Sequence, residues 1–360
     1  MQSNKGQPHG MRIIGETQDP DTSAATGAIE PLTSPASTPT AATGDLPGST
    51  APKENATDLL TDEAPMDSEA PDDDAQVTDD APLSTPTLGD VLVAVEELWP
   101  ASLAEAWDEV GPVVGRPERP VTRIMFAVDP TLEVIADAIS RGTQLLITHH
   151  PLLLKPVNSV AATGFKGEAV HLLIESGCAL VTAHTNADSA LGGVSDVIAD
   201  ALGVIDTTPL SPSKDGLPEE GIGRVGMLPE PMKLGDFAER VFTTMPTVAG
   251  GVRVAGDPAG IVQRIAVCGG AGDSLFDAVR ASEADVYVTA DLRHHPASEA
   301  REASLNGKPY LIDVSHFASE WLWLPAAAKA LGNVLEEMGH DVEIEVSQVN
   351  SDPWDFIITP

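Results

Sequence analysis

The chain has 360 residues, of which 42% are hydrophobic and 4% aromatic, and its formal net charge is −35. This length is enough for one large domain or two ordinary ones, and a charge this negative argues against nucleic acid as a partner, because like charges repel. The sequence has no run of 18 apolar residues that would span a membrane, and residues 1–10 lack the apolar core of a signal peptide. We therefore expect a cytoplasmic protein that does not bind membranes.

Residues 1–86 are rich in Ala, Thr, Ser, Pro, Asp and Glu, and they carry 16 of the 55 acidic residues but only 3 of the 20 basic ones. Such a segment buries too little apolar surface to offset the entropy that it would lose on ordering. The composition therefore predicts a disordered acidic tail over 1–86, followed by a folded region that begins near Thr87.

The folded region opens with alternating helical and strand patterns. An apolar helical stripe covers residues 88–98, and either Thr87 or Asp90 can cap this helix. Strands are then expected at 121–128, 144–148 and 179–183, and helices at 132–140, 164–176 and 195–202. This alternation, with short turns, favours a parallel sheet covered by helices. We assign residues 87–206 to an N-terminal lobe.

A second set of elements follows residues 207–223, a segment rich in Pro, Ser and Gly that predicts a linker or a crossing loop. The C-terminal lobe then covers 224–360, with strands expected at 226–228, 252–255, 263–267, 285–289 and 342–346 and helices at 234–245, 274–282 and 321–338. Pro325 either kinks the last helix or marks the start of a new one. The expected fold class is α/β, with two similar lobes whose mixed, largely parallel sheets are flanked by helices.

Three of the predicted strands end in residue types that commonly bind metals. They are His149 and His150 after the strand at 144–148, His184 and Asp188 after the strand at 179–183, and His316 and Glu320 after an apolar run at 310–314. In open α/β sheets, ligands bind at the carboxyl ends of the strands. His316 and Glu320 are four residues apart, so they share a face if a helix begins there.

These segments resemble a known family. ITHHPLL, AHTNAD, ADLRHHPASEA and DVSHFASE are similar to motifs of the NIF-three-like family, also called the GTP cyclohydrolase I type 2 homologue family, and the similarity extends from about Leu88 to the C-terminus. The resemblance implies a metal site in the cleft between two lobes, with Glu320 bridging two ions, His150 and Asp188 on one ion, and His149 and His316 on the other. The 127 residues between Asp188 and His316 are too few for the extra domain of longer members, so we expect the short form. The family also implies a homo-oligomer, commonly a hexamer.

The expected ligands restrict the metal and the chemistry. Three imidazoles and two carboxylates suit zinc, iron, manganese or cobalt rather than calcium, and the two cysteines form no CxxC pair, so we expect Cys178 and Cys268 to be buried core residues. Five protein ligands are too many for one catalytic ion with open positions but suit two divalent ions with a bridging hydroxide.

This chemistry predicts a metal-dependent hydrolase acting on a nucleotide or another phosphate-containing substrate. The family label implies hydrolytic opening of the GTP imidazole ring, and a phosphoesterase is the nearest enzymatic alternative. An alternative from another class is a non-catalytic protein that stores metal or acts in regulation. A roomy cavity at the ions favours the enzyme, whereas saturated ions without access favour storage.

Further residues near the expected site have less certain roles. His184, His294 and His295 are candidates to support the ligands or to orient a substrate, and Arg293 to hold a phosphate, although solvated loop residues or a salt bridge explain the last three equally well. The glycines at 269–272 predict either a tight turn, which we favour, or an anion cradle. Compared with the family motifs, this chain has Glu109 for Asn, Pro112 for Leu, Ala290 for Gly and Pro296 for Asp, and the sequence does not decide how these departures act.

Overall fold

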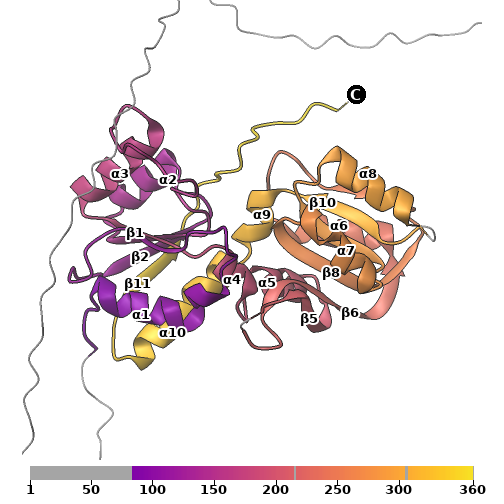
Figure 1. The fold of residues 1–360 in the computed structure, drawn as a ribbon, viewed down its shortest axis with the longest axis horizontal. Helices are drawn as coiled ribbons and strands as arrows, with labels where there is room; N and C mark the ends of the chain where they lie inside the picture. Colours follow the sequence, from indigo (N-terminus) through magenta and orange to yellow (C-terminus); the bar gives the residue numbers. More distant parts are fainter. Residues whose placement is uncertain (1–82, 215, 305–306, 360) are drawn as a thin grey trace, which may run out of the picture. The chain divides into compact units, whose positions relative to one another are not determined.

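A computed structural model describes residues 83–214, 216–304 and 307–359, which lie within one compact unit, Ala75–Pro360. The predicted tail lies outside these ranges, apart from residues 83–86. The described part contains two β-sheets, each with helices packed on its faces (Figure 1). No helix within the described ranges is both long and apolar enough to cross a membrane. The predicted α/β class with two lobes is confirmed.

The first sheet is mostly parallel and has the strand order β1-β4-β3-β2-β11. Strands β2, β3 and β4 are short, largely apolar runs, as expected for strands that are buried on both faces. The parallel edge strand β11 alternates Glu with Ile and Val, and β1 is an antiparallel edge strand. Their bounds are β1 (Gly111–Val114), β2 (Arg123–Ala127), β3 (Leu145–Thr148), β4 (Ala179–Thr182) and β11 (Glu343–Val346).

Helices cover both faces of this sheet, and the alternation of side chains along β2 shows how. Ile124 and Phe126 pack into one core with α1 and α10, whereas Met125 and Ala127 pack into another with α2 and α3, because successive side chains of a strand point to opposite faces. The helices are α1 (Leu88–Leu98), α2 (Leu132–Ser140), α3 (Phe165–Ser176) and α10 (Leu324–Glu337). The predicted cap of α1 is a capping box of Thr87 and Asp90.

The second sheet is mixed, with the order β5-β6-β8-β9-β10-β7, and only β8–β9 and β9–β10 pair in parallel. Helices α5 and α6 cover one face, and α7 and α8 the other. The strands are β5 (Ile205–Pro212), β6 (Gly221–Lys233), β7 (Arg253–Ala255), β8 (Ile261–Ala271), β9 (Val286–Ala290) and β10 (Tyr310–Val314). The helices are α5 (Val194–Ala201), α6 (Leu234–Thr244), α7 (Phe276–Ala281) and α8 (His294–Ala303).

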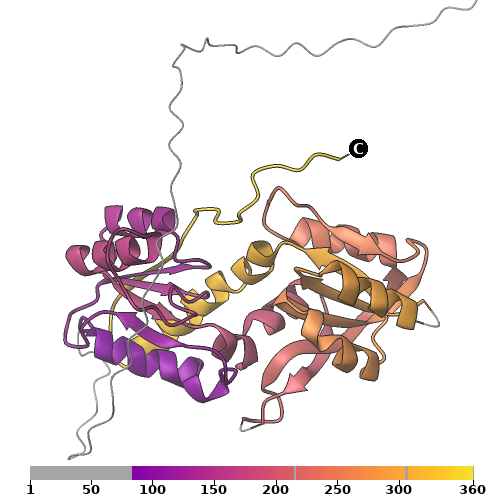
Figure 2. The same ribbon diagram turned by 45° about the horizontal axis from the view of Figure 1, so that its top comes forward.

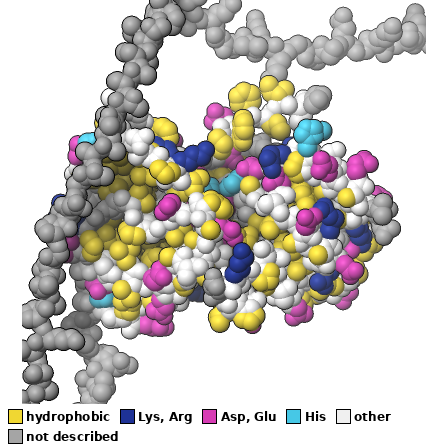
Figure 3. Space-filling view, viewed as in Figure 1, with side chains coloured by type: hydrophobic (Ala, Val, Ile, Leu, Met, Phe, Trp, Pro, Cys, Tyr) yellow, Lys and Arg dark blue, Asp and Glu magenta, His cyan; other side chains and the backbone are white. Residues whose placement is uncertain are grey.

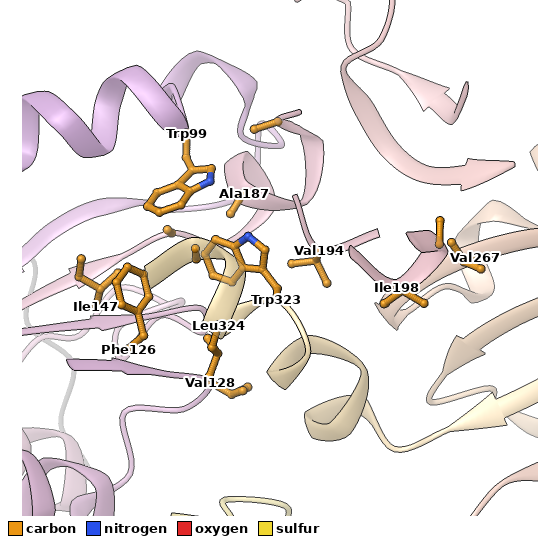
Figure 4. Packing of buried hydrophobic residues seen from close by; sticks show 14 of the residues in the cluster. Trp99, Phe126, Val128, Ile147, Ala187, Val194, Ile198, Val267, Trp323 and Leu324 are labelled. Atoms are coloured by element: carbon orange, nitrogen blue, oxygen red, sulfur yellow. The ribbon is translucent and has the colours of Figure 1, made fainter. Parts of the chain in front are cut away.

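One hydrophobic core runs through both sheets. Trp323 packs edge-on against Trp99 and Phe126, with ring centroids 5.2 and 6.4 Å away, and Val194 and Val267 belong to the same cluster (Figure 4). Two short helices complete the connection: α4 (Thr185–Ser189) and α9 (His316–Trp321). Helix α9 lies between the two sheets in both views (Figures 1 and 2).

The structure corrects two expectations about the second half and, for Pro325, decides in favour of the start of a new helix. Residues 207–223, expected as a linker, form most of β5 and the start of β6, because proline is tolerated on an edge strand such as β5. The strand expected at 342–346 does not close the second sheet; it is β11, which pairs with β2 in the first. The helix expected at 321–338 is α10 alone, and Pro325 stands in its first turn, where its missing N–H costs no hydrogen bond. The exact boundaries of the lobes stay a prediction.

Candidate metal centre

The ends of three strands bring the predicted ligands into one cluster. Each residue follows the carboxyl end of its strand directly or lies in the short helix that begins there. His149 and His150 follow β3, His184 and Asp188 follow β4, and His316 and Glu320 lie in α9 after β10. The helix that the sequence predicted for His316 and Glu320 is therefore present, with Ser315 as its cap.

Glu320 lies at the centre of this cluster and is almost fully buried. Its Oε1 is 2.9 Å from His316 Nε2 and 3.5 Å from His149 Nε2, and its Oε2 is 3.0 Å from His150 Nε2. Asp188 Oδ1 lies 3.7 Å from His149 Nε2. Burial alone would raise the pKa of Glu320, but the imidazoles of His150, His316 and His149 hold it well below its usual range. The carboxylate is therefore charged at neutral pH.

Each of the four histidines uses its Nδ1 atom outside the cluster. Carboxylate and carbonyl oxygens only accept hydrogen bonds, so Nδ1 must be the donor, and in the neutral imidazole the Nε2 lone pair is then free to bind a metal. The Nδ1 acceptors are Ala183 O for His149 at 2.9 Å, Asp129 Oδ1 for His150 at 2.7 Å, Asp108 Oδ1 for His184 at 2.9 Å and Asp291 Oδ2 for His316 at 2.7 Å.

The donor atoms inside the cluster fit a divalent transition metal. The Nε2 atoms of His150 and His316 lie 3.2 Å apart, an arrangement in which two neutral lone pairs repel unless a cation lies near both. The Nε2 atom of His149 and the Oε2 atom of Glu320 are buried and have no hydrogen-bond partner among the described residues. Buried polar atoms are normally paired, so these two are available for a metal.

Two groups in the cluster are compact enough to hold an ion, and they share one histidine. One contains His149, His150 and His184, and the other His150, His316 and Glu320. The second group can bind a metal with the residues that the sequence predicted. The first adds His184, which the sequence suggested only as a supporting residue.

Asp108, in the loop before β1, orients the ring of His184 through a hydrogen bond. The sequence analysis did not identify this residue. Asp108 accepts a hydrogen bond from the ring of His184 and others from the backbone N–H and hydroxyl of Thr185. Burial would raise the pKa of Asp108, but these bonds lower it to about 2. Asp108 lies in the segment AEAWDEVG, which resembles the family's motif, and the departures at Glu109 and Pro112 leave it unchanged. Both departures are exposed, and Pro112 stands on the edge strand β1, where its missing N–H is tolerated.

Asp129 and Asp291, which orient His150 and His316, were also missed. Asp129 stands two residues after the end of β2 and Asp291 directly after β9. Both therefore carry the signal that identified the ligands, an acidic residue at the carboxyl end of a predicted strand. They were missed because the search for ligands considered only the strand ends that carry histidine motifs.

The structure does not bring the other supporting candidates into the cluster. His294 and His295 are exposed in the first turn of α8, where their rings contact each other. Arg293 is exposed and forms an ion pair with Asp273. Pro296 lies in the first turn of α8, as proline prefers.

The glycines at 269–272 do not form a free anion cradle. The backbone N–H groups of Gly269 and Gly270 already donate to the hydroxyls of Ser195 and Ser319. The favoured alternative, a tight turn, is also wrong, because residues 269–271 are the last residues of β8, whose pairing with β9 is irregular between Val267 and Ala271. Gly270 has φ of +62° at this irregularity, which glycine adopts without strain. A Cβ added there would stand 2.4 Å from Glu320 Oε1, so this glycine leaves room for the central carboxylate.

Replacing Asp291 by asparagine is expected to weaken metal binding by about 10- to 100-fold, as for other residues that orient metal-binding histidines. Asparagine tolerates the left-handed backbone at this position, where φ is +54°, but its amide no longer fixes the Nδ1 proton of His316. Zinc affinity measured by competition with a chromophoric chelator tests this. Asp277→Asn, at an exposed carboxylate on α7, is the matched control, and equal affinities in the two variants would contradict the role given to Asp291.

The stability of the metal-stripped protein is expected to fall as pH rises from 7 to 10. Burial alone would lower the pKa of His316, but Glu320 and Asp291 raise it to about 10. A raised pKa adds stability that is complete below the unfolded value of about 6.5 and is lost as pH rises through the folded value. Urea denaturation in EDTA measures the effect. His316→Asn should flatten this dependence and His171→Asn, at an exposed histidine on α3, should not; identical curves would refute the prediction.

Comparison with known proteins identifies the family. The sequence profile of Duf34/NIF3 (NGG1p interacting factor 3) matches residues 86–353. The chain belongs to the Duf34/NIF3 family. A Streptomyces coelicolor relative, called GTP cyclohydrolase 1 type 2 homolog, is 47% identical over 270 residues, which cover 75% of this chain and 94% of the relative. The family predicted from the HHP and SHxxSE motifs is therefore confirmed.

The relatives also bear on the form of the Duf34/NIF3 domain. A Mycobacterium tuberculosis protein with the same name is 34% identical, and its alignment is 374 residues long yet covers 75% of this chain and 97% of the relative. That relative therefore carries residues that this chain lacks, which agrees with the predicted short form.

Solved structures agree with the fold. Staphylococcus aureus protein SA1388 is 27% identical with a TM-score of 0.68, and the match covers 77% of this chain and all of that one. A Bacillus cereus protein related to NIF3 has a TM-score of 0.70 at 24% identity, over 76% of this chain and all of that one, and it supports the fold alone.

Proposed function

We propose that this Duf34/NIF3 protein is a metal-dependent hydrolase that holds two divalent ions, such as zinc, iron, manganese or cobalt, in the cluster around Glu320. The observation that carries the proposal is the convergence of Nε2 lone pairs from His149, His150 and His316 on one buried carboxylate. The cluster offers four imidazoles and two carboxylates, from His149, His150, His184, His316, Asp188 and Glu320, and this is more than one ion with open positions needs. Asp188 completes the proposed ligand set, and His184 is a further candidate.

The chain's own residues have distinct tasks in such a reaction. Bound divalent ions would supply Lewis acidity and would lower the pKa of a water bound to them to near neutrality. Asp129 and Asp291 hold the tautomers of His150 and His316, and Glu320 keeps its charge at the centre. The burial of Glu320 and His149 excludes bulk water from the inner side of the cluster, which strengthens the local electrostatic interactions.

A cavity beside the cluster favours an enzyme over the storage alternative. It has a volume of about 710 Å³, and His150 and His316 line it. This size falls in the range of small-molecule sites. A ligand therefore has access to the proposed ions, which pure storage does not require. The nucleotide or phosphate-containing substrate predicted from the sequence stays a prediction, and the hydrolase proposal does not depend on it.

Metal analysis combined with two chromogenic substrates tests the proposal. The purified chain should contain close to two transition-metal ions and hydrolyse p-nitrophenyl acetate or p-nitrophenyl phosphate, and EDTA should abolish this turnover. His150→Ala should lose both properties, whereas His171→Ala, outside the cluster, should keep both. Two bound ions without turnover of either ester would favour metal storage, and no bound metal in the wild type would refute the site itself.

The family resemblance also predicts a homo-oligomer, commonly a hexamer, and we retain this as a separate proposal. Light scattering that gives the mass of one chain at micromolar concentration would refute it.

A further inference from the structure

The cavity at the metal cluster has one wall of a different chemical character from the rest. Residues 351–358 form an extended C-terminal segment, which leaves the first sheet after β11 (Figure 1). Its side chains Trp354, Phe356 and Ile357 line the cavity together with the buried Phe317 of α9. Part of the cavity wall is thus apolar and largely aromatic, and His150 and His316 line the same cavity.

The base of this segment is attached to the metal cluster. Ser351 donates a hydrogen bond to Asp129 Oδ2, on the carboxylate that holds His150. Asp352 accepts a hydrogen bond from Ser315, the cap of the helix that carries His316. The apolar wall is therefore fixed relative to the ligands on both sides of the cluster, as a substrate-positioning element requires.

Apart from the proposed ions themselves, the charges around the cavity argue against a polyanionic ligand. Four carboxylates line it, on Asp129, Asp291, Asp313 and Asp352, and the one lining arginine, Arg253, is already paired with Asp313. On the face shown in Figure 3, histidine, acidic and basic side chains lie close together near the middle of the molecule. Among the described lining residues no unpaired Arg or Lys is available to hold a polyphosphate, and the charge of the whole chain also repels anions.

We infer that this site takes a small ligand with two parts: a compact metal-binding group of at most one negative charge, and a planar or apolar group that packs against Trp354 and Phe356. The inference rests on the proposed metal site and narrows its substrate class. It favours an uncharged ring-bearing ester, amide or heterocycle and disfavours nucleoside triphosphates. Trp354 and Phe356 determine specificity, because the exposed fractions of 70% and 75% leave their faces free for a ligand.

Two hydroxamates with the same metal-binding group test this wall on the full-length, zinc-loaded chain. Acetohydroxamate carries a methyl group and benzohydroxamate a phenyl ring. Benzohydroxamate should bind at least about fivefold more tightly in the wild type, since burying a ring adds favourable apolar contact. In Trp354→Ala and Phe356→Ala this ratio should fall to about twofold or less. Acetohydroxamate affinity and zinc content should not change.

Phe165→Ala is the matched control, because Phe165 is equally exposed, at 64%, but lies on α3 and does not line the cavity. It should keep the wild-type ratio. GTP and acetohydroxamate are then compared as competitors of bound benzohydroxamate. Displacement by GTP should require a higher concentration than displacement by acetohydroxamate.

The remaining outcomes separate the two proposals. Two zinc ions per chain, with the ratio of hydroxamate affinities unchanged in both Trp354→Ala and Phe356→Ala, would overturn the inference about the apolar wall and would still support the metal site. GTP displacing benzohydroxamate more strongly than acetohydroxamate does would overturn the charge argument. A loss of oligomer mass in Trp354→Ala or Phe356→Ala, measured by light scattering, would show that these side chains cover a second copy of the chain and would also overturn the inference. Absence of zinc would overturn both proposals.

Discussion

Replacing Glu320 by glutamine is expected to remove most of the bound metal from the purified protein. Glutamine has nearly the same shape but no charge, and its amide nitrogen cannot bind a metal in place of a carboxylate oxygen. Residues that only orient the ligands of a metal typically change its affinity by about 10- to 100-fold, so the loss at the central carboxylate should exceed about 100-fold. Metal content by mass spectrometry after extensive dialysis measures it directly.

Glu337→Gln is the matched control for this substitution, because Glu337 is an exposed glutamate at the end of α10. It removes the same charge from the chain without touching the cluster. Equal metal content in the two variants would show that Glu320 is not a ligand, and that its short distances to His316 and His150 are ordinary buried ion pairs.

Replacing Gly270 by alanine is expected to reduce metal binding nearly as strongly, through space rather than charge. The new Cβ would stand 2.4 Å from Glu320 Oε1 and 3.1 Å from His316 Nε2. Real Cβ atoms do not approach other atoms this closely, so Glu320 and His316 must move apart from their present positions. The left-handed backbone at this residue, with φ of +62°, adds a cost of about 1–2 kcal/mol to the free energy of folding.

Gly142→Ala separates the two effects. Gly142 also has a positive φ, +74°, but a Cβ there would meet no atom within 4 Å. Both variants should lose similar stability in urea denaturation, and only Gly270→Ala should lose zinc in competition with a chelator. Full zinc affinity in Gly270→Ala would mean that the cluster adapts to the extra methyl group. The glycine would then be needed only for the left-handed backbone near the end of β8.

The ligands could be predicted from the sequence because each follows an apolar run that reads clearly as a strand. Pro151 follows the two histidines His149 and His150 and ends their strand, and Glu320 lies one helical turn after His316. The local geometry of these ligands therefore follows from short-range rules. The residues that orient them, Asp108 and Asp129, act over 76 and 21 positions respectively. Such pairings depend on which strands become neighbours, and residue pattern alone does not determine that.

The same limit explains the errors in the fold. Residues 207–223 carry loop-forming residue types, yet tertiary pairing makes part of them edge strands, where proline and glycine cost little. The last strand, β11, is short and alternates Glu with Ile and Val, a pattern that suits an edge of either sheet, and its partner β2 lies more than two hundred residues earlier. His294 and His295 were candidates to support the ligands, but they begin a helix whose first turn faces solvent.

The return of β11 to the first sheet has a consequence for how the chain matures. During synthesis the first sheet lacks this edge strand, and α10 is missing from the face that it shares with α1. Glu320 and His316 also emerge late, so no complete metal centre exists on a nascent chain. Contacts between distant parts of a sequence form slowly, and we expect metal uptake to follow closure of the N- and C-terminal parts. Metal bound in this centre would therefore mark a chain in which α9, α10 and β11 have been made and have packed against the N-terminal part.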